Sequence, residues 1–256
     1  MFRFLRIAIL LTILLVVAGR QFLAPERLNS WDKPLWVTIY PVLVEADPAT
    51  RRYVKSLTPR AFDAINEFLK QQAARYGFSL EQPVVIQVAD PLTTAPPPAL
   101  PTENSGLGVA LWSLKMRWWV WRHSRQDGLA PADAKMFVLY QQSKPGQLME
   151  RSVGVRNGAF GIVNAEASRQ MTARNRVIIT HELLHILGAV DRYDMASGQP
   201  LAPDGLANPQ QSPLYPQQRA EIMAGRIATS AHGWRRPATL KSCVIGAATA
   251  AEIGWL

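Results

Sequence analysis

The segment VIITHELLHIL, residues 177–187, constrains the fold more than any other part of the chain. Apolar residues cover almost every face of a helix formed by this segment, and a helix that is apolar all round lies inside a protein. Three polar side chains, His181, Glu182 and His185, interrupt the apolar surface. Burying a polar group without a hydrogen-bond partner costs about 2–7 kcal/mol. We therefore expect the fold to supply a partner for all three.

The spacing of the three polar residues indicates what that partner is. Histidines four residues apart project from one side of a helix, about 6 Å apart along its axis, which suits two ligands of a tetrahedral zinc ion. Glu182 lies about 100° round the helix from His181, where it can reach water at the metal without being a ligand. His-Glu-x-x-His is the zinc metalloprotease signature. We therefore predict a Zn²⁺ cofactor, with a metal-free polar cluster as the alternative.

The third metal ligand has three candidates. Gly188 can take the left-handed conformation that ends a helix, and a chain that turns there would return Asp191 to the two histidines. Glu221 and His232 are the alternatives, but both depend on a loop of about thirty residues folding back. We favour Asp191 as the ligand that joins His181 and His185.

The stretch HELLHILGAVD, residues 181–191, resembles the extended metzincin motif of two histidines, a glycine and a third ligand. Most metzincins have a third histidine where this chain has Asp191, and the aspartate is similar to the snapalysin-like branch. The resemblance implies a methionine on a tight turn beneath the metal, for which Met223 in AEIMAG lies suitably downstream. It also implies an edge strand that pairs with an extended substrate, for which residues 152–165 are the candidate by position.

The activity that the resemblance implies is zinc-dependent hydrolysis of peptide bonds in a protein or peptide substrate. Glu182 would act as the general base, taking a proton from metal-activated water and passing it to the leaving amine. No tyrosine follows Met223 where some metzincins use one, so Tyr193 and Tyr215 are candidates for stabilising the oxyanion. The alternative function is a non-catalytic, metal-stabilised, membrane-tethered binding protein. The presence of Glu182 disfavours this alternative, because a purely structural metal site has no use for a base.

The N-terminal segment predicts export. Arg3 and Arg6 precede twelve uncharged, mostly aliphatic residues, Ile7 to Ala18, and positive charges before such a block favour translocation of the rest of the chain. Twelve residues are short for a bilayer span and typical of a signal peptide. We predict a signal anchor over residues 1–24 and a zinc metallopeptidase-like domain over 25–256, facing the periplasm or the cell exterior. Secretion after cleavage of the signal peptide is the alternative.

Charge and cysteine content limit the partners. The net charge of +9 favours an acidic partner surface, with a basic solvated face as an equal alternative. Export disfavours nucleic acid as that partner. Cys243 is the single cysteine, so the chain forms no internal disulfide, and we expect this residue to be a small buried filler.

The segment 111–126 combines four tryptophans with four Lys and Arg residues. We expect a helix, with a strand as the alternative. Its side chains Trp112, Trp118 and Trp121 are predicted to lie in the core while the cations are solvated. The alternative is that the tryptophans and cations contact lipid headgroups.

Periodicity and turn residues predict a single α/β (α+β) domain. The order of the expected elements predicts a central helix and a loop-rich C-terminal part. The metzincin resemblance implies, more finely, a zincin-like mixed twisted sheet with a central active-site helix and a loop-rich C-terminal subdomain. The strands are expected over 33–46, 82–90 and 134–142, with a hairpin over 152–165 turning at Asn157-Gly158. The helices are expected over 58–77, 111–126, 175–188, 217–227 and 246–256, and loops over 91–106 and 194–216.

Overall fold

The structure is a computed structural model that describes residues 4, 6–7, 11–12, 28–45, 47–78, 81–98, 106–126, 128–142, 152–155 and 158–256. The predicted signal anchor over residues 1–24 falls largely outside these ranges. Among the residues that are described, no helix combines the length and the apolar character that crossing a bilayer requires.

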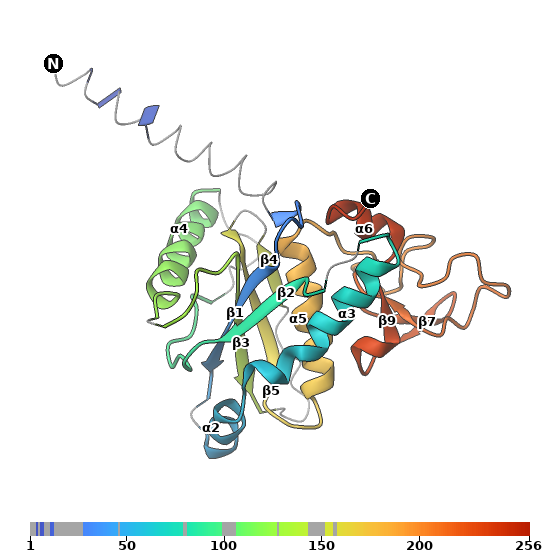
Figure 1. Ribbon diagram of the computed structural model, residues 1–256, viewed down its shortest axis with the longest axis horizontal. Helices are drawn as coiled ribbons and strands as arrows, with labels where there is room; N and C mark the ends of the chain where they lie inside the picture. Colours follow the sequence, from blue (N-terminus) through green and yellow to red (C-terminus); the bar gives the residue numbers. More distant parts are fainter. Residues whose placement is uncertain are drawn as a thin grey trace.

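A five-stranded sheet forms the centre of the fold (Figure 1). Its strands are β1 (Leu35–Leu43), β2 (Val84–Val88), β3 (Ala134–Gln141), β4 (Val153–Val155) and β5 (Phe160–Glu166). They lie in the order β2-β1-β3-β5-β4. All neighbours are parallel except β4, which runs antiparallel to β5 at the edge of the sheet. The predicted mixed α/β architecture is therefore confirmed, and so is the pairing expected for the hairpin, although Asn157 of its turn lies outside the described residues.

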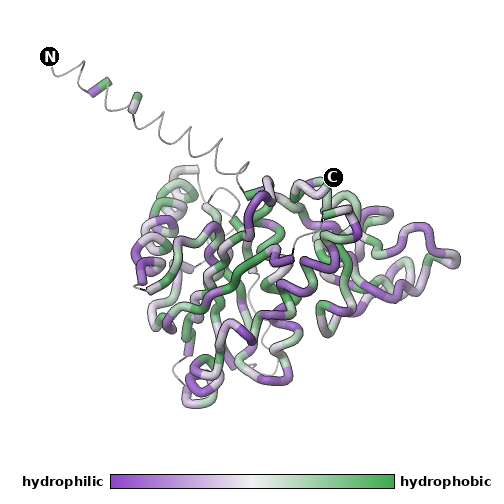
Figure 2. Tube along the Cα trace, in the orientation of Figure 1, coloured by the Kyte–Doolittle hydropathy of each residue, from purple (hydrophilic) through white to green (hydrophobic). Residues whose placement is uncertain are grey.

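Helices cover both faces of the sheet, which explains why β1 and β3 are buried along almost their whole length. On one face lie α3 (Asp63–Ala74) and α5 (Thr172–Ile186), which share a core with residues such as Ile39 and Met136. On the other face lies α4 (Gly106–His123), packed on Tyr40 and Phe137. Figure 2 shows apolar residues along the central strands and hydrophilic residues along the outer C-terminal loops.

The helical predictions need three corrections. A short helix α2 (Pro48–Lys55) was not predicted, and it begins where Asp47 accepts hydrogen bonds from the N–H groups of two following residues. The helix predicted over 58–77 is split into a 3₁₀ turn, η1 (Pro59–Phe62), and α3. The helix predicted over 217–227 is wrong: this segment contains β6 (Ala220–Glu221), a turn and the start of β7 (Ile227–Ser230).

The C-terminal part is rich in loops, as predicted. Two small sheets pair β6 with β9 (Cys243–Val244) and β7 with β8 (Gly233–Arg235), and a 3₁₀ turn, η3 (Leu240–Ser242), precedes β9. The chain ends in α6 (Ala247–Glu252), which confirms the last predicted helix. Cys243 is buried and free, as expected.

The helix predicted over 111–126 is confirmed by α4, but the expected burial of its tryptophans is wrong in part. The buried tryptophan is Trp119, whereas Trp118 and Trp121 are 60% and 49% exposed. Trp112 is half-buried and donates a hydrogen bond to the carbonyl of Pro98. The prediction failed because both sides of this helix are apolar, so the sequence does not say which side faces the sheet.

Candidate metal centre

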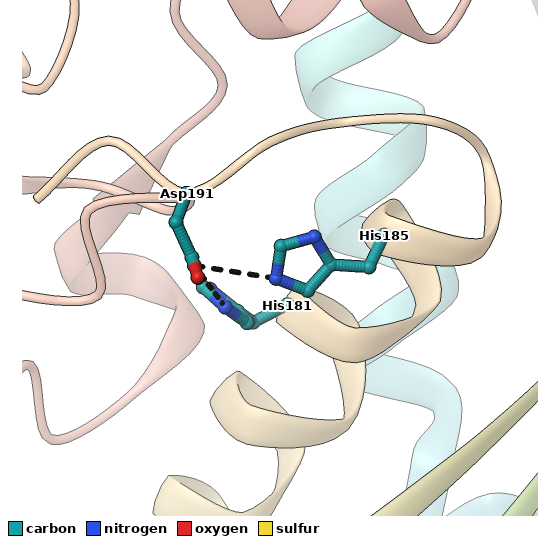
Figure 3. A group of neighbouring side chains, drawn as sticks. All are labelled: His181, His185 and Asp191. Atoms are coloured by element: carbon teal, nitrogen blue, oxygen red, sulfur yellow. Dashed lines mark ion pairs between the residues drawn. The ribbon is translucent and has the colours of Figure 1, made fainter. Parts of the chain in front are cut away.

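The structure brings His181, His185 and Asp191 together (Figure 3). The two histidines lie one turn apart on α5, with their ring centroids separated by 4.7 Å. The Oδ1 atom of Asp191 lies 3.2 Å from Nε2 of His181 and 3.2 Å from Nε2 of His185. The three ligand atoms lie within 4.8 Å of one another, and no other such group of His, Cys, Asp or Glu occurs among the described residues.

The end of α5 explains how Asp191 reaches the histidines. Gly188 has φ of 109°, in the left-handed region that glycine adopts without steric cost. The N–H of Ala189 bonds to the carbonyl of Leu184 at 3.0 Å, which ends the helix in the manner typical of a glycine C-cap. The chain then reverses, and the N–H of Arg192 donates to the carbonyl of Met223 at 3.0 Å. This bond ties the segment carrying Asp191 to the turn after β6.

Backbone carbonyls orient both imidazoles. Nδ1 of His181 lies 2.9 Å from the carbonyl oxygen of Ile222, and Nδ1 of His185 lies 2.7 Å from that of Ala189. An Nδ1–H that donates to a carbonyl leaves the lone pair on Nε2, which is how metal-binding histidines are held. The two Nε2 atoms therefore point toward Asp191. In a neutral imidazole each Nε2 is a lone-pair donor that can bind a metal ion, and in an imidazolium each donates a hydrogen bond to the carboxylate.

Three lone-pair donors that converge in this way fit a cation. Two imidazole nitrogens and a carboxylate oxygen repel one another unless a proton or a metal ion lies between them. Zinc ligands at about 2.0–2.1 Å in a tetrahedral arrangement are separated by about 3.3 Å, close to the 3.2 Å observed between Asp191 and each histidine. The side chains of His181, His185 and Asp191 remain 14%, 20% and 31% exposed, so solvent or a substrate has access, as catalytic zinc sites require.

Glu182 lies beside this group in a buried position. It is 5% exposed, and its Oε2 atom has no hydrogen-bond partner among the described residues. Burial raises the pKa of Glu182, although the neighbouring histidines and the N–H of Gly154 oppose this rise. For Asp191, burial acts in the same direction, but the adjacent imidazoles outweigh it and hold the pKa of that carboxyl well below its usual range.

The two alternative third ligands lie elsewhere. Glu221 is fully buried and accepts four hydrogen bonds. These come from Met223 N and Ala224 N at Oε2, and from Gly246 N and Thr249 Oγ1 at Oε1. His232 is exposed in the turn between β7 and β8. The structure therefore places Asp191, and neither alternative, next to the histidines.

Glu221 instead shapes the turn that carries Met223. Its two bonds to the backbone N–H groups of Met223 and Ala224 replace the hydrogen bonds that a helix would make there. Met223 is fully buried, and the preceding carbonyl of Ile222 holds His181. The turn thus helps to position His181 in the candidate metal centre, a role of Glu221 that was not predicted from the sequence.

The sequence analysis also missed Gly154 on the edge strand β4. A Cβ atom at this position would lie 2.6 Å from the carbonyl oxygen of Glu182 and 2.6 Å from Cβ of His185. Only a glycine lets β4 approach α5 so closely, and a glycine inside a short valine strand is the sequence signal for such an approach.

An arginine contacts two aromatic rings, one of which follows Asp191 closely in the chain. The guanidinium of Arg226 lies 4.0 Å from the ring centroid of Tyr193 and 4.7 Å from that of Trp234. Tyr193 is two residues beyond Asp191. The other tyrosine considered for the oxyanion, Tyr215, belongs to the loop over 194–216.

Comparisons with known proteins identify no family for this chain. No family model matches the sequence, and no curated protein matches it. Among solved structures, the chain is similar to OgpA from Akkermansia muciniphila with a TM-score of 0.35 and 13% identity. The match covers 88% of this chain and 63% of OgpA, so the chain spans less than two thirds of that protein. This likeness is too remote to carry an argument about fold or function.

Proposed function

We propose that the protein is a zinc-dependent endopeptidase of the metzincin type. Its metal ligands are His181, His185 and Asp191, and Glu182 is the general base. The observation that carries this proposal is the convergence of a carboxylate oxygen with two imidazole nitrogens, each 3.2 Å from it. Beside them lies a buried carboxylate with an oxygen that has no hydrogen-bond partner among the described residues. The chain's membrane anchor and its position outside the cytoplasm stay predictions from residues 1–24.

The chemistry divides between the cofactor and the chain. When bound, zinc would supply a Lewis acid that lowers the pKa of water to about 7. The chain supplies the proton acceptor, since Oε2 of Glu182 has no hydrogen-bond partner among the residues that the structure describes and can accept a proton. Burial raises the pKa of this carboxyl, which makes it a better proton acceptor and a competent donor to the leaving amine.

The edge strand β4 supplies a place for an extended substrate. It lies at one of the two edges of the sheet, and Val153 is 52% exposed. Gly154 lets the strand approach the turn of α5 that carries Glu182 and His185. An extended peptide that adds to this edge would gain backbone hydrogen bonds and lie beside the proposed metal centre.

Two further features support the metzincin type over other zinc peptidases. The third ligand follows directly after a glycine turn, and a buried methionine lies on the turn whose carbonyl orients His181. The carboxylate that would be the third ligand in a gluzincin-like arrangement, Glu221, is instead occupied by four hydrogen bonds.

The test uses the full chain loaded with zinc and a complex peptide mixture whose cleavage products are identified by mass spectrometry. We expect the wild type to cut peptides internally. Glu182→Gln should retain zinc and the melting temperature but lose about 10²–10⁴-fold in rate, because only proton transfer is removed. Glu67→Gln is the matched control, because it makes the same carboxylate-to-amide change at an exposed position on α3. This variant should cut at the wild-type rate. A zinc-loaded Glu182→Gln protein that cuts at the wild-type rate, or a wild type that binds zinc and cuts nothing, would contradict the proposal.

A further inference from the structure

The outer side of α4 carries a stripe of exposed apolar side chains. The helix packs on the sheet through Met116, Trp119 and Val120. On its other side, residues spaced three or four apart share one face. These residues are Leu111, Leu114, Trp118 and Trp121, with exposed fractions of 58%, 66%, 60% and 49%. We call these four residues the α4 stripe.

Positive charge surrounds the α4 stripe. Lys115, Arg117 and Arg122 are exposed on the same helix, and the guanidinium of Arg125 lies 4.2 Å from the ring centroid of Trp121. Residues 106–126 contain no Asp or Glu. The outer side of this helix is therefore apolar along its middle, and the charged residues of the segment are all cationic.

This combination fits a lipid surface better than a protein surface. Single exposed apolar residues are ordinary, whereas a contiguous apolar patch marks an interaction site. Helices that lie in a membrane interface combine Trp and Leu on one side with Lys and Arg beside them. A second copy of α4 would bring four cations against four, and like charges that face each other across a protein interface cost several kcal/mol.

We propose that the α4 stripe lies in the interface of a bilayer that contains anionic lipids, with the surrounding cations bound to the headgroups. This contact is independent of the proposed peptidase activity and of the predicted anchor over residues 1–24. Because α4 and α5 cover opposite faces of the sheet (Figure 1), docking through α4 leaves the helix that carries His181 and His185 on the side away from the lipid.

The test places a spin label on the α4 stripe of the full chain, reconstituted in vesicles of phosphatidylcholine and phosphatidylglycerol in equal parts. Leu114→Cys and Trp118→Cys are the labelling sites, and Leu201→Cys, on an exposed C-terminal loop, is the control. The native thiol does not interfere, because burial raises the pKa of Cys243 to about 12. Accessibility of the label to oxygen and to a water-soluble nickel chelate is measured by electron paramagnetic resonance.

We expect labels at 114 and 118 to be accessible to oxygen and shielded from nickel, and the label at 201 to be accessible to nickel. The proposal would be overturned if the labels at 114 and 118 remained accessible to the nickel chelate. Shielding from both reagents would also overturn it, because that result indicates contact with protein.

A charge variant tests the role of the cations separately. Each basic residue near an anionic surface strengthens binding about fivefold, so changing Lys115, Arg117 and Arg122 to Gln should lower the ratio of docked to undocked label on the order of a hundredfold. The matched control changes Arg52, Lys55 and Arg60, which are exposed near α2, and leaves the net charge the same as in the test variant. An equal effect of the two triple variants would overturn the proposed contact, because only the overall charge would then matter.

Discussion

Glu221→Gln tests the hydrogen-bond network beneath the proposed metal centre. Met223 N and Ala224 N donate to Oε2 at 2.6 and 3.0 Å, and Gly246 N and Thr249 Oγ1 donate to Oε1 at 3.2 and 2.8 Å. Glutamine has the same shape but replaces one oxygen by an NH₂ group. Its oxygen will take the Oε2 position, because the N–H of Met223 requires an acceptor there. The N–H of Ala224 also donates to this position, although it shares its hydrogen with the backbone carbonyl of Glu221 at 3.1 Å.

The NH₂ group then occupies the Oε1 position. The hydroxyl of Thr249 can rotate and accept a hydrogen bond, but the N–H of Gly246 cannot, so it loses its acceptor. An unsatisfied buried group costs about 1–3 kcal/mol. The bonds to Met223 and Ala224 lose the strengthening of a charged acceptor, about 1 kcal/mol each. We therefore expect a loss of about 3–5 kcal/mol in the free energy of unfolding, which lowers the melting temperature on the order of 10 °C.

The assay is urea unfolding together with thermal melting of the zinc-free protein. Glu67→Gln makes the same chemical change at an exposed site on α3 and should shift the free energy of unfolding by less than about 0.5 kcal/mol. If Glu221→Gln unfolds like Glu67→Gln, the expected loss of stability is refuted. That result would mean that the carboxyl is neutral in the native protein, since burial raises the pKa of Glu221, or that the four bonds contribute nothing.

Two glycine substitutions probe the approach of the chain to the proposed centre. Gly154→Ala puts a Cβ within 2.6 Å of the backbone of Glu182, so β4 must shift away from α5. We expect the free energy of unfolding to fall by about 1–3 kcal/mol and peptide binding to weaken, while zinc is retained. Gly106→Ala, where nothing lies within 4 Å, is its control, and equal peptide affinities in the two variants would refute the placement of β4. Gly188→Ala forces a left-handed backbone on a residue with a Cβ, so we expect about 1–3 kcal/mol of destabilisation and weaker zinc binding by isothermal titration. Unchanged zinc affinity in Gly188→Ala would show that this turn does not position Asp191.

The local features of the fold were predictable from the sequence. The apolar, β-branched and aromatic residues that indicate β1 and β3 each lie within one strand. The signal for helix α2, Asp47-Pro48, is equally local, but it was missed because the helix has only eight residues. The position of Asp191 was predictable for the same reason, because Gly188 and Asp191 are separated from His185 by only a few residues.

Features that depend on distant contacts were not predictable. Glu221 was considered as a metal ligand because its distance along the chain from the two histidines suits a gluzincin-like third ligand. Two of its actual hydrogen-bond partners, Gly246 and Thr249, follow it by 25 and 28 residues, and no pattern near position 221 indicates them. The helix predicted over 217–227 failed for the same reason. The sequence does not determine which side of α4 is buried, because both sides are apolar. Contact with the sheet determines it.

Zinc binding by the full chain and its Asp191→Ala variant tests the proposed metal centre most directly. After removal of metal with a chelator, titration with zinc should give about one ion per wild-type chain. Asp191→Ala should weaken binding roughly a hundredfold or more, since even residues that only support a metal ligand contribute 10–100-fold. His232→Ala should bind as the wild type does. A wild type that takes up no zinc, or an Asp191→Ala variant that binds it with wild-type affinity, would contradict the assignment of His181, His185 and Asp191 as the metal site.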